Sequence, residues 1–144
     1  SVPYFPRGDL STIELFKLIY EGKFFYQLYF QEEGVAEQEF EGNIRKYLES
    51  TYFSIDGRGM KEQFENPLNA MEKSEDSKYL DGVIEFDNYP DWITREEMDY
   101  YIGEFEGSGM RGPLNRYRAQ EIDFADLAEF KDQKLKSKCI FPVL

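Results

Sequence analysis

The sequence predicts a small, mainly α-helical single domain that carries one long irregular insertion. Three observations support this prediction: capping boxes that open helices, apolar residues at helical spacing, and the lack of any convincing strand alternation. The chain has 144 residues, the length of one domain, and 41% of them are hydrophobic and 17% aromatic. That content is enough to build a hydrophobic core.

The composition excludes several classes of function. The 17 basic and 29 acidic residues give a net charge of -12, so nucleic acid and anionic membranes are poor partners. The chain has no histidine, so it cannot by itself form a histidine-based catalytic relay or a His-Glu-x-x-His zinc site. Its single cysteine, Cys139, allows neither an intrachain disulfide nor a thiolate zinc site. We expect no metal and no cofactor, and the lack of a signal-like or membrane-spanning apolar run predicts a cytoplasmic location.

The first helix is predicted to begin at Ser11, because Ser11 and Glu14 have the spacing of a capping box. Apolar residues follow at helical spacing, and Gly22 is a natural end for the helix.

The next stretch, 24–31, contains five aromatic residues among its eight. Its apolar run fits a buried strand and a short buried helix equally well. In a helix, Tyr26 would share a face with Tyr29 and Phe30. Aromatic rings with polar tips suit the wall of an apolar pocket that donates a few hydrogen bonds, but they equally suit a core segment whose hydroxyls are satisfied.

A continuous second helix is predicted over about 36–52, where apolar residues follow a helical pattern. The segment 56–91 then contains several Gly, Pro, Asn and Asp residues, which predicts a long variable loop or a pair of short helices. Within it, the carboxylates of Glu72, Glu75 and Asp76 lack the spacing of a calcium loop and are predicted to form a solvated face.

The strongest helix start in the sequence lies at Thr94. Thr94 and Glu97 form a capping box, and Ile93 and Met98 occupy the positions of a hydrophobic staple. Gly107 and Gly109 should end this helix, and its buried stripe is predicted to be Met98, Tyr101, Ile102 and Phe105.

Two shorter helices are predicted after this one, over 114–120 and from about Asp123. Pro142 interrupts the apolar run at the end of the chain and predicts an edge strand or a tail there.

Two separated stretches resemble soluble epoxide hydrolases of the α/β-hydrolase superfamily. Residues 25–37, FYQLYFQEEGVAE, are similar to the first tyrosine-bearing segment of the family's cap, or lid. Residues 92–118, which end in SGMRGPLNRYR, are similar to the second such segment and occur in the family's order. The ends, 2–7 and 123–140, resemble the segments that leave and rejoin the family's core. The resemblance covers nearly all of the single domain at 1–144, but it covers only the cap and no core sheet.

In that family, a helical cap covers a core that supplies an aspartate nucleophile and a histidine base. The resemblance implies that Tyr26 and Tyr117 donate hydrogen bonds to the epoxide oxygen, a role that suits a neutral phenol with a pKa of about 10. The chain has no nucleophile elbow, so it holds no catalytic residue of its own. Arg116 stands where the family usually has tryptophan, which would place a charge near the pocket wall. The other implied ligand-binding residues are Phe25, Gln27, Tyr29 and Phe30.

These observations predict a free-standing cap-like domain that binds a small molecule or forms oligomers and has no hydrolase activity on its own. The alternative is the cap portion of an epoxide hydrolase whose catalytic core is on a separate chain or was removed. The expected partners are a small apolar or oxygen-bearing molecule and either further copies of the chain or a hydrolase core. A protein partner is expected because a lone cap would expose a sizeable apolar surface.

Overall fold

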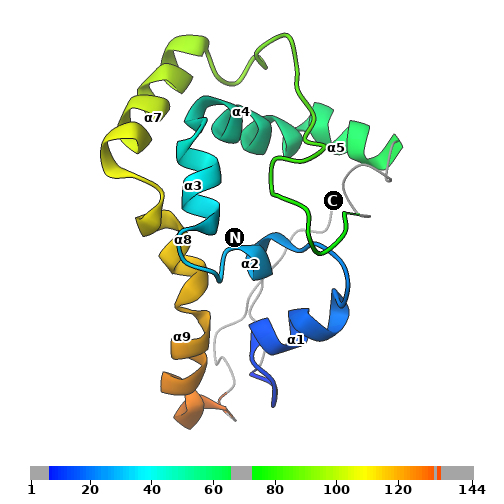
Figure 1. Ribbon diagram of the computed structural model, residues 1–144, viewed down its shortest axis with the longest axis vertical. Helices are drawn as coiled ribbons and strands as arrows, with labels where there is room; N and C mark the ends of the chain where they lie inside the picture. The colour runs from blue at the N-terminus through cyan, green and yellow to red at the C-terminus, as the bar shows by residue number, and fades with distance from the viewer. Residues whose placement is uncertain (1–6, 66–72, 132, 134–144) are drawn as a thin grey trace.

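The structure is a computed structural model that describes residues 7–65, 73–131 and 133, and it is helical throughout much of that range (Figure 1). The described residues include no β-strand, and a single isolated antiparallel bridge joins Lys23 to Ser74. The helices are α1 (Thr12–Ile19), α2 (Tyr26–Tyr29), α3 (Val35–Glu41), α4 (Ile44–Ser54), α5 (Gly57–Glu65), α7 (Arg95–Ser108), α8 (Arg111–Arg118), α9 (Gln120–Asp126) and the short 3-10 helix η1 (Ala128–Phe130).

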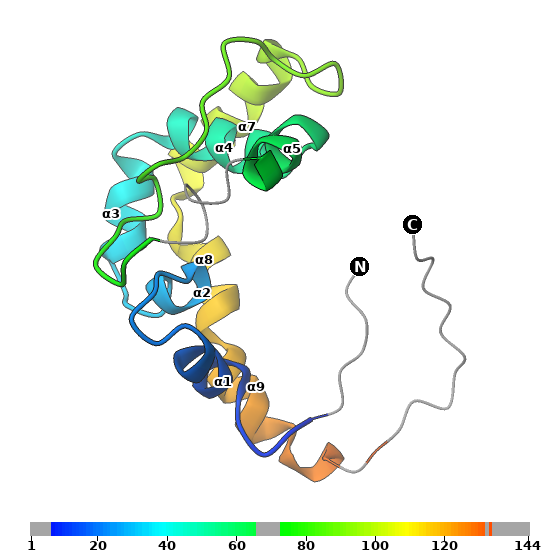
Figure 2. The same cartoon turned by 90° about the vertical axis from the view of Figure 1, so that its right-hand side faces the viewer.

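The helices form an elongated arrangement with two ends (Figures 1 and 2). Helices α7, α8 and α9 follow one another along one side of the molecule. At one end α4 packs against both α5 and α7, and at the other end α1 packs against α9. Helices α2 and α3 lie between these ends, and α3 contacts α8.

Two apolar clusters stabilise this arrangement. The first lies where α4 meets α7, and the second lies where α2, α3 and α8 converge. Tyr47 and Phe105 pack against both clusters, so the two form one continuous core. The buried members are Ile44, Leu48, Phe53, Ile93, Met98 and Ile102 in the first cluster, and Phe30, Ala36, Phe40, Met110 and Leu114 in the second.

Both predicted capping boxes are confirmed. The Ser11 hydroxyl accepts a hydrogen bond from the backbone N–H of Glu14 at 3.1 Å, and the Glu14 carboxylate accepts one from the Ser11 N–H at 2.8 Å. Thr94 makes the same reciprocal pair with Glu97 at the start of α7. Ile93 and Met98 are both buried, as the hydrophobic staple requires.

The prediction of one continuous helix over 36–52 is wrong. Helix α3 ends at Glu41, and α4 begins at Ile44 after a break at Gly42 and Asn43. The Asn43 side chain accepts a hydrogen bond from the Lys46 N–H at 3.0 Å and thereby caps a new helix. Asparagine is among the best N-cap residues, so this local bond competes successfully with continuation of the first helix. The apolar stripe is thus divided, with Phe40 in the second cluster and the later positions in the first.

The insertion at 56–91 is not wholly irregular, because α5 occupies its first part. The Asp56 carboxylate accepts hydrogen bonds from the N–H groups of Arg58 at 2.8 Å and Gly59 at 2.9 Å, which opens this helix. The rest of the described insertion contains no helix. Glu75 and Asp76 are exposed, as predicted, whereas Glu72 lies outside the described residues.

The C-terminal half differs from its prediction in three details, namely one buried position and the bounds of two helices. Tyr101 is 44% exposed, so it does not belong to the buried stripe of α7, whose buried members are Met98 and Ile102. Helix α8 runs over Arg111–Arg118, where the prediction was 114–120, and α9 begins at Gln120, earlier than the predicted start near Asp123. The predicted tail around Pro142, Cys139 and most of the segment 2–7 lie outside the described residues.

Candidate functional site

The structure brings Tyr26 and Tyr117 together, although they come from opposite parts of the sequence. Tyr26 is the first residue of α2, and Tyr117 lies in the last turn of α8. Their ring centroids are 5.9 Å apart, and the rings are nearly perpendicular at 83°. Phe30 contacts both rings edge to face, at 5.5 Å from Tyr26 and 5.1 Å from Tyr117. Phe30 itself is buried, so both phenol rings pack against a residue of the hydrophobic core.

The two phenol groups keep their hydrogens available. The Gln27 side-chain amide donates a hydrogen bond to the Tyr26 hydroxyl oxygen at 2.8 Å, which leaves the Tyr26 O–H free to donate. The Tyr117 hydroxyl makes no hydrogen bond to any residue in the described part of the chain. Within that same part, the only buried side-chain polar atom without a partner is Arg7 Nε, so the Tyr117 hydroxyl must reach the surface.

The electrostatic surroundings keep Tyr117 in its neutral form. Partial burial raises the pKa of the Tyr117 phenol above its ordinary value, and the neighbouring Tyr26 raises it further. The charge of Arg116 acts in the opposite direction, but the net shift is upward. The Arg116 side chain is exposed, so the residue that stands in place of the family's tryptophan extends into solvent. Tyr117 can therefore act as a hydrogen-bond donor at any ordinary pH.

Further aromatic rings surround Phe30 on its other sides. Tyr79 lies 5.7 Å from Phe30 and 5.1 Å from Phe40, and Phe40 stacks on Tyr47 at 3.8 Å. Burial raises the pKa of both Tyr47 and Tyr79. Tyr79 was missed by the sequence interpretation, because it lies in the insertion where no periodic pattern marks it as buried.

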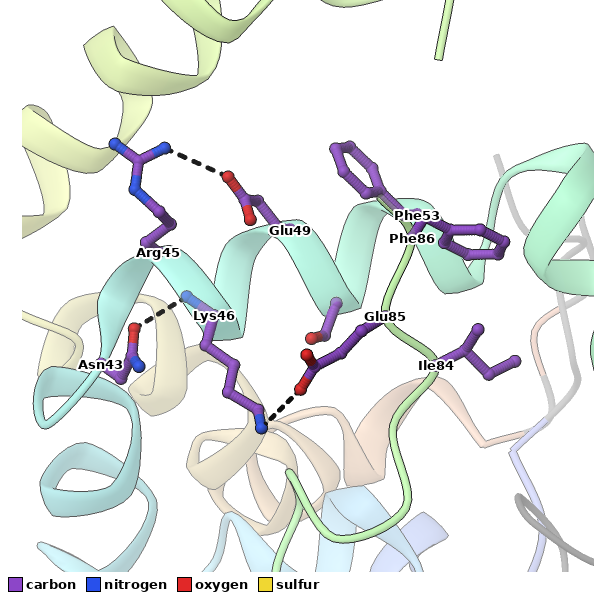
Figure 3. A pocket seen from close by; sticks show the side chains of 9 residues that line it. Asn43, Arg45, Lys46, Glu49, Phe53, Ile84, Glu85 and Phe86 are labelled. Atoms are coloured by element: carbon purple, nitrogen blue, oxygen red, sulfur yellow. Dashed lines mark hydrogen bonds and ion pairs between the residues drawn. The ribbon is translucent and has the colours of Figure 1, made fainter. Parts of the chain in front are cut away.

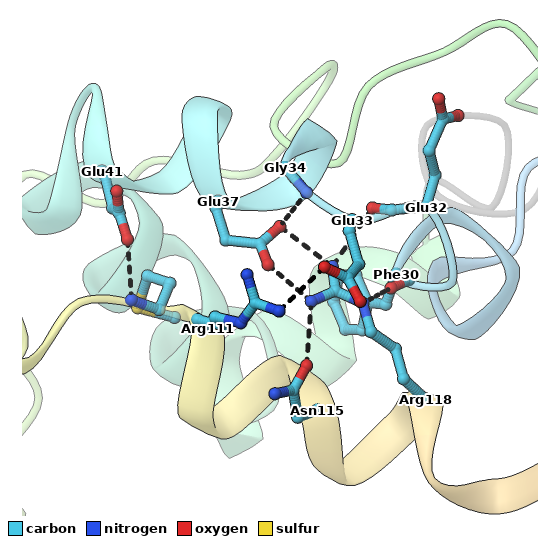
Figure 4. A network of polar contacts seen from close by, with 10 residues as sticks. Phe30, Glu32, Glu33, Gly34, Glu37, Glu41, Arg111, Asn115 and Arg118 are labelled. Carbon is cyan, nitrogen blue, oxygen red and sulfur yellow. Dashed lines mark hydrogen bonds and ion pairs between the residues drawn. The ribbon is translucent and has the colours of Figure 1, made fainter.

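A polar network centred on Arg118 holds α8 against the turn that follows α2 (Figure 4). The Arg118 guanidinium donates to the backbone carbonyls of Phe30 at 2.8 Å and Glu32 at 3.1 Å. It also pairs with both carboxylate oxygens of Glu37, and the two side chains are only 11% and 12% exposed. Arg118 directly follows Tyr117, and Phe30 packs against Tyr26, so this network joins the two segments that carry the phenols.

The Glu37 carboxylate accepts hydrogen bonds from two residues. The donors are the Arg118 guanidinium and the backbone N–H of Gly34, the residue that opens α3. Gly34 adopts a φ of 87°, a left-handed conformation that favours glycine. Hydrogen bonds from Arg118 and from the backbone lower the pKa of Glu37 to about 2.

This pKa predicts a specific acid sensitivity. An unfolded Glu titrates at about 4.3, so the folded state gains stability from the ionised Glu37 above that pH and loses it as the pH falls toward 2. The loss should reach about 3 kcal/mol at most, at about 1.4 kcal/mol for each pKa unit. Urea unfolding measured between pH 5 and pH 2.5 should show this loss in the wild type. Glu37→Gln should be less stable at pH 5 and should show a flatter pH dependence; an unchanged pH dependence in this variant would contradict the assignment.

The remaining predicted ligand-binding residues have different surroundings. Phe25 stacks on Tyr20 with a centroid distance of 4.1 Å and also contacts Tyr26 at 4.9 Å. The Tyr29 hydroxyl donates to the Glu39 carboxylate at 2.7 Å, and burial together with that carboxylate raises the pKa of Tyr29. Tyr29 is thus engaged with α3 and not with the tyrosine pair.

Gln31 ties the two tyrosine-bearing helices together. Its side-chain amide donates to the backbone carbonyl of Gln27 at 2.8 Å and to that of Tyr117 at 3.3 Å. The sequence interpretation gave Gln31 no role, and only the folded structure shows that its amide lies between α2 and α8.

Two hollows on the surface lie away from the tyrosine pair. The first, of about 320 Å³, lies between α4 and the insertion, where Lys46 forms an ion pair with Glu85 at 2.7 Å (Figure 3). The second, of about 720 Å³, is lined by residues that include Tyr52, Tyr89 and Trp92. Neither hollow is lined by Tyr26 or Tyr117, so the pair lies outside both.

The described residues contain neither a helix that could span a membrane nor a cluster of side chains that could bind a metal ion. No described helix has both the length and the apolar character needed to cross a membrane. Among the same residues, no three or more acidic or cysteine side chains are grouped so that they could hold a metal ion.

The chain is similar in sequence to part of known epoxide hydrolases. The chain is 38% identical over 139 residues to bifunctional epoxide hydrolase 2 of Rattus norvegicus, a match that covers 96% of this chain and 23% of the rat protein. It is 29% identical over 141 residues to epoxide hydrolase A of Mycobacterium tuberculosis, which covers 98% of this chain and 42% of that protein. No protein-family profile matches the chain.

Solved structures agree with the sequence comparison. The crystal structure of epoxide hydrolase A from Mycobacterium thermoresistibile aligns with a TM-score of 0.80 and 30% identity, covering 91% of this chain and 40% of that one. An epoxide hydrolase from an endophytic Streptomyces aligns with a TM-score of 0.77 and 36% identity, covering 90% of this chain and 38% of that one. The chain thus spans less than half the length of each of these relatives.

Proposed function

We propose, from the resemblance of this chain to the cap domain of epoxide hydrolases, that it forms the cap side of an epoxide-binding site. In this site Tyr26 and Tyr117 donate hydrogen bonds to the oxygen of a small ligand. The rest of the catalytic machinery would come from a hydrolase core.

One observation carries the proposal: two phenols with available hydrogens lie with their rings 5.9 Å apart and share a buried aromatic support. An epoxide oxygen has two lone pairs, and it gains negative charge when its ring opens. Two neutral donors that converge on it can bind the oxygen and stabilise the developing alkoxide. The proposal includes Phe25 as a neighbouring apolar contact and excludes Tyr29, whose hydroxyl is engaged by Glu39.

Exposed apolar side chains support the need for a partner surface. On α1, Leu15, Leu18 and Ile19 are 44%, 66% and 58% exposed. Helix α1 packs against α9, which exposes Ile122 at 63%, and Leu127 just beyond it is 52% exposed. Apolar groups at this density on one end of a small domain favour burial against another protein surface. We assign that surface to a hydrolase core, and light scattering that shows stable homo-oligomers would favour a second copy instead.

The purified chain should not hydrolyse epoxides. It has no histidine to act as base, and it has no nucleophile elbow. Incubation with styrene oxide, followed by chromatography of the diol, should give the rate of the buffer alone. Turnover above that rate that disappears in Tyr26→Phe would contradict this part of the proposal.

The chain should nevertheless prefer an oxygen-bearing ligand to its hydrocarbon counterpart. Styrene oxide and ethylbenzene share an aromatic ring and a two-carbon substituent but differ in the oxygen, so the ratio of their affinities isolates the hydrogen bonds. Tyr26→Phe and Tyr117→Phe should each lower that ratio by about 2- to 12-fold, since one hydrogen bond contributes about 0.5–1.5 kcal/mol. NMR titration measures both affinities.

Tyr100→Phe provides the control for this titration, because Tyr100 is 67% exposed on α7, away from the pair. It should leave the ratio unchanged. If all three substitutions lowered the affinity ratio equally, or if none of them changed it, the case for the tyrosine pair would be removed.

A further inference from the structure

A chain of side-chain amides leads to the Tyr26 hydroxyl. Gln27 donates through its amide nitrogen to the Tyr26 oxygen at 2.8 Å. The amide oxygen of Gln27 in turn accepts a hydrogen bond from the Gln120 amide at 3.0 Å. Gln27 belongs to α2 and Gln120 to α9, so the chain joins two helices at the site, and all three side chains are half-buried.

The direction of this amide chain decides what the Tyr26 phenol can do. A phenol has one hydrogen to donate, whereas its oxygen can accept. When the amide nitrogen of Gln27 faces the phenol oxygen, the phenol hydrogen remains free for a ligand. If both amides were turned end for end, the Gln27 oxygen would accept that hydrogen and Tyr26 would have none to offer.

Gln120 donates to the Gln27 oxygen in the structure, and this bond is compatible only with a Gln27 nitrogen that is directed toward Tyr26. The backbone of Gln27 is held as well, since its carbonyl accepts from Gln31 at 2.8 Å.

We propose that Gln27, held by Gln120, is a positioning residue that keeps the Tyr26 phenol as a hydrogen-bond donor toward the ligand. This inference rests on the proposed function and adds a specific cause for the donor state of Tyr26. It assigns Gln27 an action through Tyr26 and not a direct ligand contact.

The decisive variant is Gln27→Glu, which has nearly the same shape as glutamine. An ionised carboxylate can only accept hydrogen bonds, so it will take the Tyr26 hydrogen. At pH 7 the ratio of styrene oxide to ethylbenzene affinity should fall to the value of Tyr26→Phe, about 2- to 12-fold below wild type. Gln27→Leu removes the amide without capturing the hydrogen and should lower the ratio less.

Three further measurements complete the test. The ratio in Gln27→Glu should recover in part as the pH falls from 7 to 4, because a carboxyl with an ordinary pKa of about 4.3 then becomes protonated and regains a hydrogen to donate. Gln120→Leu should lower the ratio partly, because it releases the Gln27 amide. Gln38→Glu, an exposed change of the same type on α3, should leave the ratio unchanged at every pH.

A purely structural role for Gln27 predicts the opposite order, with leucine more harmful than the similarly shaped glutamate. That order, or a Gln27→Glu variant with the wild-type ratio, would overturn the inference while the proposed function stands, provided that Tyr26→Phe still lowers the ratio. If neither tyrosine variant changes the ratio, the proposed function fails and this inference fails with it.

Discussion

Gly59→Ala should destabilise the protein more than any other single methyl addition at a described glycine. A Cβ atom at position 59 would lie 2.2 Å from the carbonyl oxygen of Phe53 and 2.4 Å from the Cα of Ser54. Both are backbone atoms of α4, so no side-chain rotation can relieve the contact, and α5 would have to move away from α4. We expect a loss of about 2–4 kcal/mol in the free energy of unfolding, measured by urea denaturation.

Gly103→Ala is the matched control, because a Cβ at position 103 in the interior of α7 meets nothing within 4 Å. It should stabilise the protein by about 0.5–1 kcal/mol, since alanine loses less backbone freedom than glycine in a helix. If the two variants changed the urea midpoint alike, the close approach of α4 and α5 would not exist in solution.

Arg118→Met should have the next largest effect, because it leaves the Glu37 carboxylate with little exposure and without its cation. The substitution also removes the donors to the carbonyls of Phe30 and Glu32 while keeping an apolar stem of similar length. Removing one partner of a shielded ion pair is far more costly than the pair's net contribution, so we expect a loss of about 2–4 kcal/mol. The preference for styrene oxide over ethylbenzene should fall as well, since α8 is then free to move Tyr117 away from Tyr26.

Arg111→Met tests whether charge removal alone explains that result. Arg111 lies on the same helix and pairs with Glu33 at 2.9 Å, but the two side chains are 69% and 62% exposed. Exposed pairs contribute little, so the loss should stay below about 1 kcal/mol. Equal losses of unfolding free energy in the two arginine variants would show that the Arg118 network does not hold α8 against the turn after α2.

Local signals in the sequence predicted most of the helical structure. The capping boxes at Ser11 and Thr94 and the staple at Ile93 specify helix starts through bonds within a few residues, so they can be read without the fold. The division between α3 and α4 could not be read in the same way, because the apolar stripe runs through it and only the cap at Asn43 marks the break. For the insertion, the sequence allowed either a long loop or a pair of short helices, and α5 occupies its start.

The tyrosine pair shows a different limit. Tyr26 and Tyr117 were selected by resemblance, and no spacing rule could have shown that they meet, since their approach depends on tertiary packing around Phe30. The supports of the pair were missed for the same reason. Arg118, Gln31 and Gln120 act across elements that are remote in sequence, so their roles emerge only from the folded contacts.

The most direct test of the paired donors is an NMR titration of the chain labelled with 13C at the tyrosine Cζ carbons. The Cζ signal reports hydrogen bonding at the attached hydroxyl, and the signals of the pair are assigned by their loss in Tyr26→Phe and Tyr117→Phe. On addition of styrene oxide, both signals should shift with one common saturation curve, whereas ethylbenzene should leave them nearly unmoved. Signals that do not respond to styrene oxide, or that respond equally to both compounds, would contradict the account of two phenols that bind one ligand oxygen.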